Sequence, residues 1–218
     1  MNRQQLSSLL KGARFVLVSS LVFFSGGVLH AALLPPGAIQ NAAAENNPVG
    51  ATLVFSTGLV PFASATFTGS LRSDVFTNDA SSPFGPNALT FVYQLINNVG
   101  SPDAIDRLTV SSFNGFQTDV SFTPVPGPTA PSTVSRSVNG SVIGFEFNTP
   151  GFPLTGVATP VVIQTNAFNF APTLASIIDG SATSVASLAP VAIIPEPATI
   201  TLVVGALVLL ASPRKRRG

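Results

Sequence analysis

Over much of the chain, apolar and polar side chains alternate with a period of two. Between residues 65 and 75, Ala, Phe, Gly, Leu and Val alternate with Thr, Ser, Arg and Asp, which predicts a strand buried on one face. The run 89–96 is apolar on both faces at several positions, which predicts a central strand. Shorter runs predict further strands at 105–111, 118–123, 132–138, 141–147, 160–165, 173–178 and 183–188.

Turn-forming residues separate these runs. Asn139-Gly140 lies between two extended runs and predicts a hairpin with a two-residue loop, and Asp179-Gly180 predicts another turn. The proline-rich segment 124–131 cannot lie inside a sheet. We therefore expect residues 51–189 to form an all-β body, an antiparallel β-sandwich or jelly roll, after an irregular lead-in at 32–50.

The first residues have the order of a secretory signal. A basic, polar start precedes an apolar run at 15–29, and small residues follow it. This order predicts a signal peptide at 1–31, cleaved after Ala31 or Ala32. The alternative is an N-terminal anchor that stays uncleaved.

The last residues consist of three segments in a fixed order. A linker at 190–197 contains Pro195, Glu196 and Pro197, which favour extended backbone. An apolar run then predicts a membrane-spanning helix at 198–212, about 22 Å long at 1.5 Å per residue against a hydrocarbon core of about 30 Å. A basic tail at 213–218 predicts the cytoplasmic side; its charged residues are Arg214, Lys215, Arg216 and Arg217. The alternative for the apolar run is a buried C-terminal helix with a solvated basic end.

Together, the Pro-Glu-Pro motif, the short apolar span and the arginine-rich end resemble the PEP-CTERM sorting signal of exported bacterial proteins. The resemblance implies recognition by an exosortase, a membrane transpeptidase that cuts near the motif. It also implies export, insertion in the inner membrane, and delivery to the cell surface or the extracellular matrix. The run 89–120 resembles the exported β-rich proteins that carry this tail, and that resemblance implies no catalytic residues.

Charge and residue types narrow the chemistry of the body. Between the terminal segments, three arginines stand against eight carboxylates, a net charge of −5. An acidic body without a basic patch argues against nucleic-acid binding. The chain has no cysteine, its one histidine is His30, and its lysines are Lys11 and Lys215. A body without His, Lys or Cys excludes Ser-His-Asp and Cys-His nucleophiles, lysine Schiff bases and zinc held by His or Cys.

Carboxylates are the remaining candidates for chemistry. Asp103, Asp106 and Asp119 are candidate calcium ligands, and the first two are a candidate acid–base pair for glycoside hydrolysis. The simpler interpretation makes them turn and strand-end residues. Tyr93 is a candidate for a sugar-binding face or for the core.

The expected function is that of an exported, membrane-inserted surface protein with no catalytic activity and no cofactor. The first alternative is a surface-anchored module that binds polysaccharide with the help of calcium. The second alternative is an acidic glycoside hydrolase.

Overall fold

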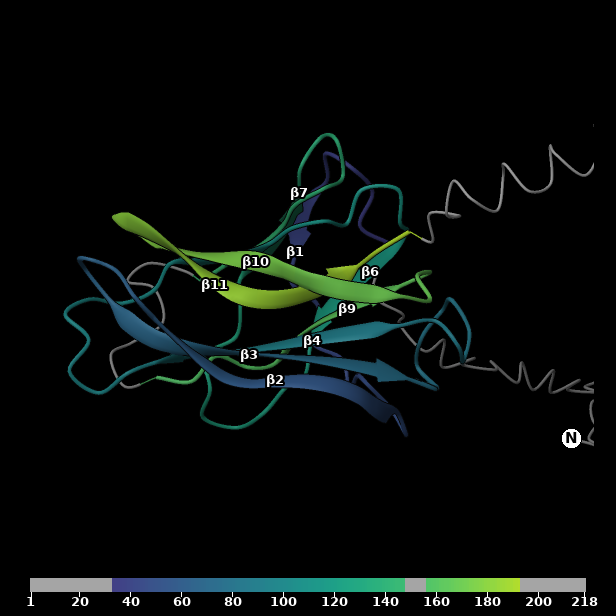
Figure 1. Ribbon diagram of the computed structural model, residues 1–218, viewed down its shortest axis with the longest axis horizontal. Helices are drawn as coiled ribbons and strands as arrows, with labels where there is room; N and C mark the ends of the chain where they lie inside the picture. Colours follow the sequence, from purple (N-terminus) through teal and green to yellow (C-terminus); the bar gives the residue numbers. More distant parts are fainter. Residues whose placement is uncertain (1–32, 148–155, 193–218) are drawn as a thin grey trace, which may run out of the picture.

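The computed structural model describes residues 33–147 and 156–192. Within these ranges the chain forms eleven strands and no helix, so the all-β prediction is confirmed (Figure 1). The strands are β1 (Ile39–Asn41), β2 (Thr52–Ala63), β3 (Thr68–Thr77), β4 (Thr90–Asn97), β5 (Arg107–Val110), β6 (Thr118–Phe122), β7 (Thr133–Arg136), β8 (Ile143–Glu146), β9 (Val161–Thr165), β10 (Phe170–Asp179) and β11 (Ser181–Pro190).

The described strands form two antiparallel sheets that pack face to face, as in a β-sandwich (Figure 1). The β4 sheet has the order β2-β3-β4-β9-β6, and the β10 sheet has the order β1-β7-β8-β5-β10-β11. No helix within the described ranges has the length and apolar character needed to cross a bilayer. The predicted signal peptide and the predicted span at 198–212 lie outside these ranges.

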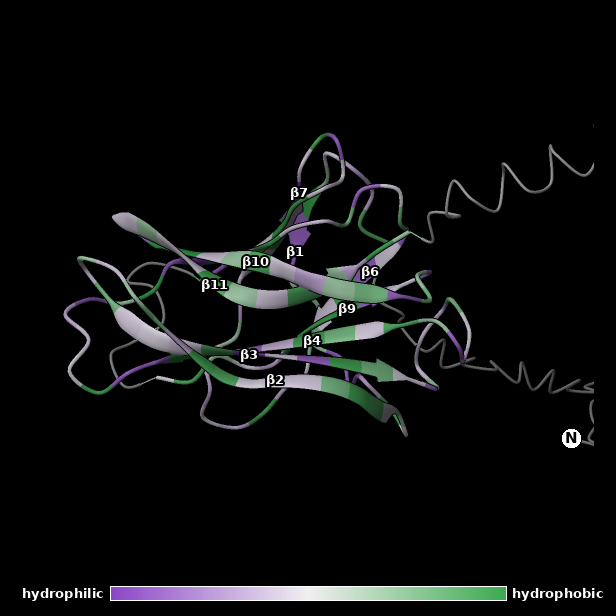
Figure 2. Cartoon of the chain, in the orientation of Figure 1, coloured by the Kyte–Doolittle hydropathy of each residue, from purple (hydrophilic) through white to green (hydrophobic). Residues whose placement is uncertain are grey.

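The core lies between the two sheets and is built from aromatic and branched side chains. β4 is the middle strand of its sheet and is buried on both faces along most of its length, as its sequence predicts. Green segments follow β4 and β9 in Figure 2, where these strands run through the interior. The largest fully buried side chains are Tyr93, Phe67, Phe91, Phe113, Phe145, Leu34, Leu71, Leu95, Ile105, Leu108 and Ile143.

The lead-in is more ordered than its sequence predicts. Residues 33–45, which we call the strap, contribute β1, and this strand pairs with β7. The strap also bridges to both ends of β6, because Leu33 pairs with Asp119 and Ala44 pairs with Phe122. The sequence does not reveal β1 because the hydrogen-bond partners of the strap lie far away along the chain. The strap therefore covers the outer edge of β6 and joins the two sheets.

Two turns test the hairpin predictions. Arg136 pairs with Ile143, so the connection between β7 and β8 is longer than the predicted two residues. Gly140 has φ of +73° while Asn139 does not have positive φ, so these two residues do not form a type I′ turn, which needs positive φ at both central residues. The turn at Gly180 is confirmed: β10 and β11 pair over ten consecutive positions without a register shift.

The described chain enters and leaves the sandwich at the same end, which we call the exit end. Leu33 bridges to Asp119 at the start of β6, and Thr118 pairs with Thr165 at the end of β9. The loop 166–169 follows β9 and contacts the segment before β6 and the residue after β11. The Gln117 amide donates to Asn166 Oδ1 at 2.9 Å, and the amide of residue 191 donates to the carbonyl of residue 169 at 3.0 Å.

The opposite end of the sandwich, which we call the far end, carries the turn at Gly180 and the loops 64–67 and 98–106. The Asp106 amide donates to the Ile178 carbonyl at 3.1 Å, and the Thr66 hydroxyl donates to the Asp179 carbonyl at 2.9 Å. Figure 1 shows this turn and the exit end on opposite sides of the molecule.

Candidate functional site

The predicted sorting residues and the predicted cleavage site lie outside the described part of the chain. These residues are Ala31, Ala32, Pro195, Glu196, Pro197, Arg214, Lys215, Arg216 and Arg217.

The three candidate calcium ligands do not come together. Asp119 is buried on β6 beside Leu33, at the exit end. Asp103 and Asp106 lie in the loop before β5, at the far end, where the Asn97 amide donates to the Asp103 carbonyl at 3.0 Å. The described residues contain no group of three or more His, Cys, Asp or Glu side chains placed to hold a metal ion. The predicted set of calcium ligands is therefore split between the two ends of the sandwich.

Asp179 is the acidic neighbour of Asp103 and Asp106 at the far end. Partial burial raises its pKa, and the negative charges of Asp103 and Asp106 and a side-chain hydrogen bond with Asp106 raise it further. The sequence gives no sign of this grouping, because Asp179 lies in a different turn. The result is a patch of acidic charge at the far end.

Tyr93 belongs to the core, as the simpler interpretation of its sequence expects. Its side chain is fully buried, and its hydroxyl donates to the Leu188 carbonyl at 2.7 Å. Pro172 stands opposite Leu188 in the β10–β11 ladder and has no N–H to offer. Burial raises the pKa of Tyr93 well above its usual value. This tyrosine therefore joins the sheets and presents no ring to a sugar.

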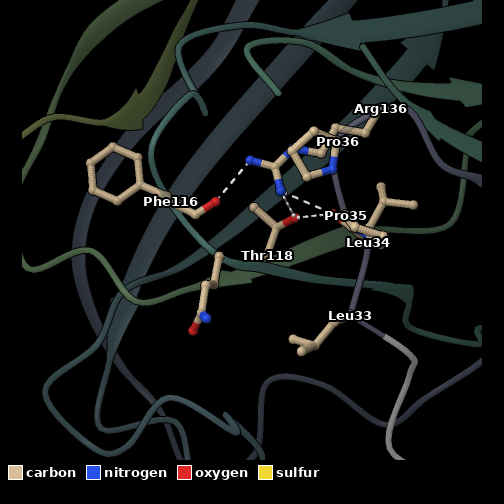
Figure 3. A pocket seen from close by; sticks show the side chains of 8 residues that line it. Leu33, Leu34, Pro35, Pro36, Phe116, Thr118 and Arg136 are labelled. Atoms are coloured by element: carbon tan, nitrogen blue, oxygen red, sulfur yellow. Dashed lines mark hydrogen bonds between the residues drawn. The ribbon is translucent and has the colours of Figure 1, made fainter. Parts of the chain in front are cut away.

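A pocket of about 250 Å³ lies at the exit end, between the start of the strap and the segment that leads into β6. Figure 3 shows Leu33 and Leu34 on one side, Phe116 on the other and the guanidinium of Arg136 between them. The remaining lining residues are Pro35, Pro36, Gln117 and Thr118. The lining is mostly apolar, and Arg136 is its only charged residue.

Arg136 uses all of its donors on neutral oxygens. Its side chain is 5% exposed. Nε donates to the carbonyl of Gly140, and Nη1 donates to the carbonyl of Leu34 and to the hydroxyl of Thr118, at 2.9–3.0 Å. Nη2 donates to the carbonyls of residues 113 and 116, at 2.8 Å each (Figure 3 draws the latter). Burial lowers the pKa of Arg136. The residue therefore fastens the strap to three other segments and has no donor left for a ligand.

Asp79 plays the corresponding role on the outer face of the β4 sheet, where it is 1% exposed. Its Oδ1 accepts hydrogen bonds from the amides of Val49 and Ser81, at 2.9 and 3.0 Å, and from the Ser81 hydroxyl. Its Oδ2 accepts from the Thr90 hydroxyl and from Gln164 Nε2, at 2.8 Å each. Burial alone raises the pKa of this carboxyl, but the hydrogen bonds from Ser81, Val49, Gln164 and Thr90 outweigh it and lower the pKa.

A second hollow, of about 370 Å³, lies at the far end among uncharged residues. It is formed by the proline-rich loop and the neighbouring segment before β9, and it is wide open. Its lining residues are Phe122, Pro124, Val125, Pro126, Pro128, Ala130 and Thr159. Neither hollow places a nucleophile beside a base.

Comparison with protein-family models, with curated proteins and with solved structures finds no match to this chain.

Proposed function

We propose that this chain is an exported surface protein whose acidic β-sandwich has no catalytic activity of its own. Its apolar segment at 198–212 holds the precursor in the membrane, with the basic tail on the cytoplasmic side. An exosortase-like transpeptidase then recognises Pro195-Glu196-Pro197 and delivers the body to the cell surface or the extracellular matrix. The signal peptide at 1–31 starts the export.

The observation that carries this proposal is the shared position of the two described ends. Leu33 and Pro190 both lie at the exit end of the sandwich. A leader before Leu33 and a membrane segment after Pro190 can therefore serve one membrane without the chain crossing the body. The described residues also contain no His, Lys or Cys. The buried charged residues Arg136 and Asp79, which we call hubs because each holds several segments together, use their side chains in hydrogen bonds within the fold.

Replacement of Pro195, Glu196 and Pro197 by alanine tests the proposal in the native host. We expect the variant to accumulate in the membrane fraction as the unprocessed precursor, measured by intact mass and by fractionation. The matched control is the replacement of Pro124-Val125-Pro126 by alanine, because this second Pro-x-Pro segment lies in a described loop at the far end of the sandwich. A triple variant at 195–197 that yields the same processed product as the unmodified chain would contradict the proposal.

The alternatives receive less support from the placement of the acids. A calcium-assisted polysaccharide site built on Asp103, Asp106 and Asp119 requires three carboxylates that lie at opposite ends of the body. An acid–base pair for glycoside hydrolysis would have to be Asp103 with Asp106 at the far end, where neither hollow is lined by them.

A further inference from the structure

We propose that the exit end of the sandwich is the face that lies against the lipid surface, so that the body stands upright on the membrane with its acidic end outward. This inference rests on the proposed function, because it requires the segment at 198–212 to enter the bilayer. It adds an orientation and a contact surface for the folded body.

Large apolar side chains are exposed at the exit end. Phe168 is 64% exposed, and it lies in the loop between β9 and β10, next to the point where β11 ends. Leu33 and Leu53 are more than half exposed, at the start of the strap and of β2, and Val191 is 38% exposed. An apolar side chain in contact with the headgroup region is removed from water, which favours the contact.

The exit end also presents no exposed ionised side chain. The described segments that form it are 33–38, 48–51, 78–89, 111–117, 137–142 and 166–169. Asp79 is the one ionisable residue in them, and it is 1% exposed. The carboxylates of Asp103, Asp106 and Asp179 gather at the far end. Because bilayers with anionic lipid have a negative surface potential, they repel that end more strongly than the exit end.

The short connection between the sandwich and the segment at 198–212 limits which end of the sandwich can contact the lipid. Six Cα–Cα steps join Ala192 to Ala198, and a fully extended chain of this length spans at most about 22 Å at 3.3–3.6 Å per residue. The ten-residue strands β10 and β11 make the sandwich about 30 Å long at 3.3 Å per residue. A body tethered at its exit end by so short a connection keeps that end near the lipid. The far end cannot reach the lipid unless the body lies on its side, and its charge disfavours that position.

Single cysteine labels test the orientation, because the chain has no cysteine of its own. Phe168→Cys places a fluorophore at the exit end, and Val99→Cys places the matched label at the far end, where Val99 is 86% exposed. The full chain is reconstituted in vesicles of phosphatidylethanolamine and phosphatidylglycerol that contain a headgroup-attached quencher. We expect quenching at position 168 to be several-fold stronger than at position 99. Equal or reversed quenching would overturn the inference.

A third label separates this inference from the proposed function. A fluorophore at Ala206→Cys reports whether the segment at 198–212 lies in hydrocarbon, by the blue shift of its emission. A water-like emission from this label would remove the proposed function and the inference with it. A hydrocarbon-like emission together with equal quenching at 168 and 99 would overturn the orientation alone. Gln117→Cys, an exposed position at the exit end, replaces the label at 168 if that variant fails to fold.

Discussion

Arg136 and Asp79 are buried ions whose hydrogen-bond partners are carbonyls, hydroxyls and amides. A buried charge is tolerated when each of its lone pairs or protons takes part in a hydrogen bond. It is costly when one of these hydrogen bonds is missing. The two hubs therefore fix segments in place: Arg136 holds the strap, and Asp79 holds the loops around residues 49 and 81 over the β4 sheet.

Arg136→Lys keeps the charge and loses the planar five-donor geometry. An ammonium has three donors and cannot reach all five acceptors. We expect the free energy of unfolding to fall by roughly 3 kcal/mol, the cost of unsatisfied buried partners, measured by denaturant titration. Arg72→Lys is the matched control, because the Arg72 side chain is 42% exposed and pairs with Asp74. A loss no larger at position 136 than at position 72 would show that the hub is not needed.

Asp79→Asn replaces an acceptor oxygen by a donor that faces other donors. We expect a loss of about 2 kcal/mol at neutral pH. The folded-state pKa of Asp79 is lowered from its usual value of 3.8. Its charge therefore stabilises the fold above that value and ceases to do so as the pH falls through the lower folded pKa. The difference in stability between the two proteins should narrow below about pH 4; a difference independent of pH would exclude a role for the charge.

Sequence alone does not reveal these hubs. The acceptors of Arg136 lie between 4 and 102 residues away from it, and Gln164 lies 85 residues from Asp79. Three arginines and eight acids are visible in the sequence of the body, but only the fold decides which of them are buried. The split of Asp103 and Asp106 from Asp119 has the same origin, because residues that are close along the chain need not be neighbours in space.

At the scale of elements, the β2–β3–β4 region depends on one glycine. Gly69 on β3 pairs with Phe62 on β2 and with Asn97 on β4. A Cβ atom built at Gly69 meets the Phe62 ring and the Ile96 carbonyl at distances that real Cβ atoms do not adopt. The aromatic ring therefore covers a position where the sheet has no side chain.

Gly69→Ala should lower the free energy of unfolding by about 2 kcal/mol, since overpacking displaces backbone and ring together. Gly144→Ala is the control. There the new Cβ meets Arg107 Nη2 at 2.5 Å, which is the end of a flexible side chain that can move. Midpoints of urea unfolding compare the two variants, and equal effects would contradict the role assigned to the Phe62 ring.

The sequence predicts the strands in which apolar and polar residues alternate regularly, and it does not predict a strand in which this alternation is interrupted. β2 was not predicted, because its pairing with β3 shifts register between Leu53 and Phe55 and again between Ser56 and Leu59. Each shift moves the following side chains to the other face and breaks the period of two. β3, β4, β10 and β11 are long, regular strands, and their sequences predict them.

At the scale of the whole molecule, the strap is the segment that holds the two sheets together along one side. Leu34 is its deepest side chain at 1% exposed, and its amide donates to the Thr118 carbonyl at 2.9 Å. Leu34→Ala should cost about 3 kcal/mol of stability, as expected for a buried leucine. Leu53→Ala, on an exposed leucine, should cost close to nothing. Thermal unfolding of both variants distinguishes a strap that closes the sandwich from one that merely lies on it.

The uninterrupted ladder between β10 and β11 determines how the body responds to force. Any tension applied to the residues after Ala192 enters the sandwich through β11 and acts along the length of that strand. The hydrogen bonds of an antiparallel pair run perpendicular to the strands, so a lengthwise pull strains all ten pairs at once and does not peel them one after another. Under the proposed attachment through the segment at 198–212, we expect the body to resist mechanical extraction when its far end is held by a neighbouring cell or polymer.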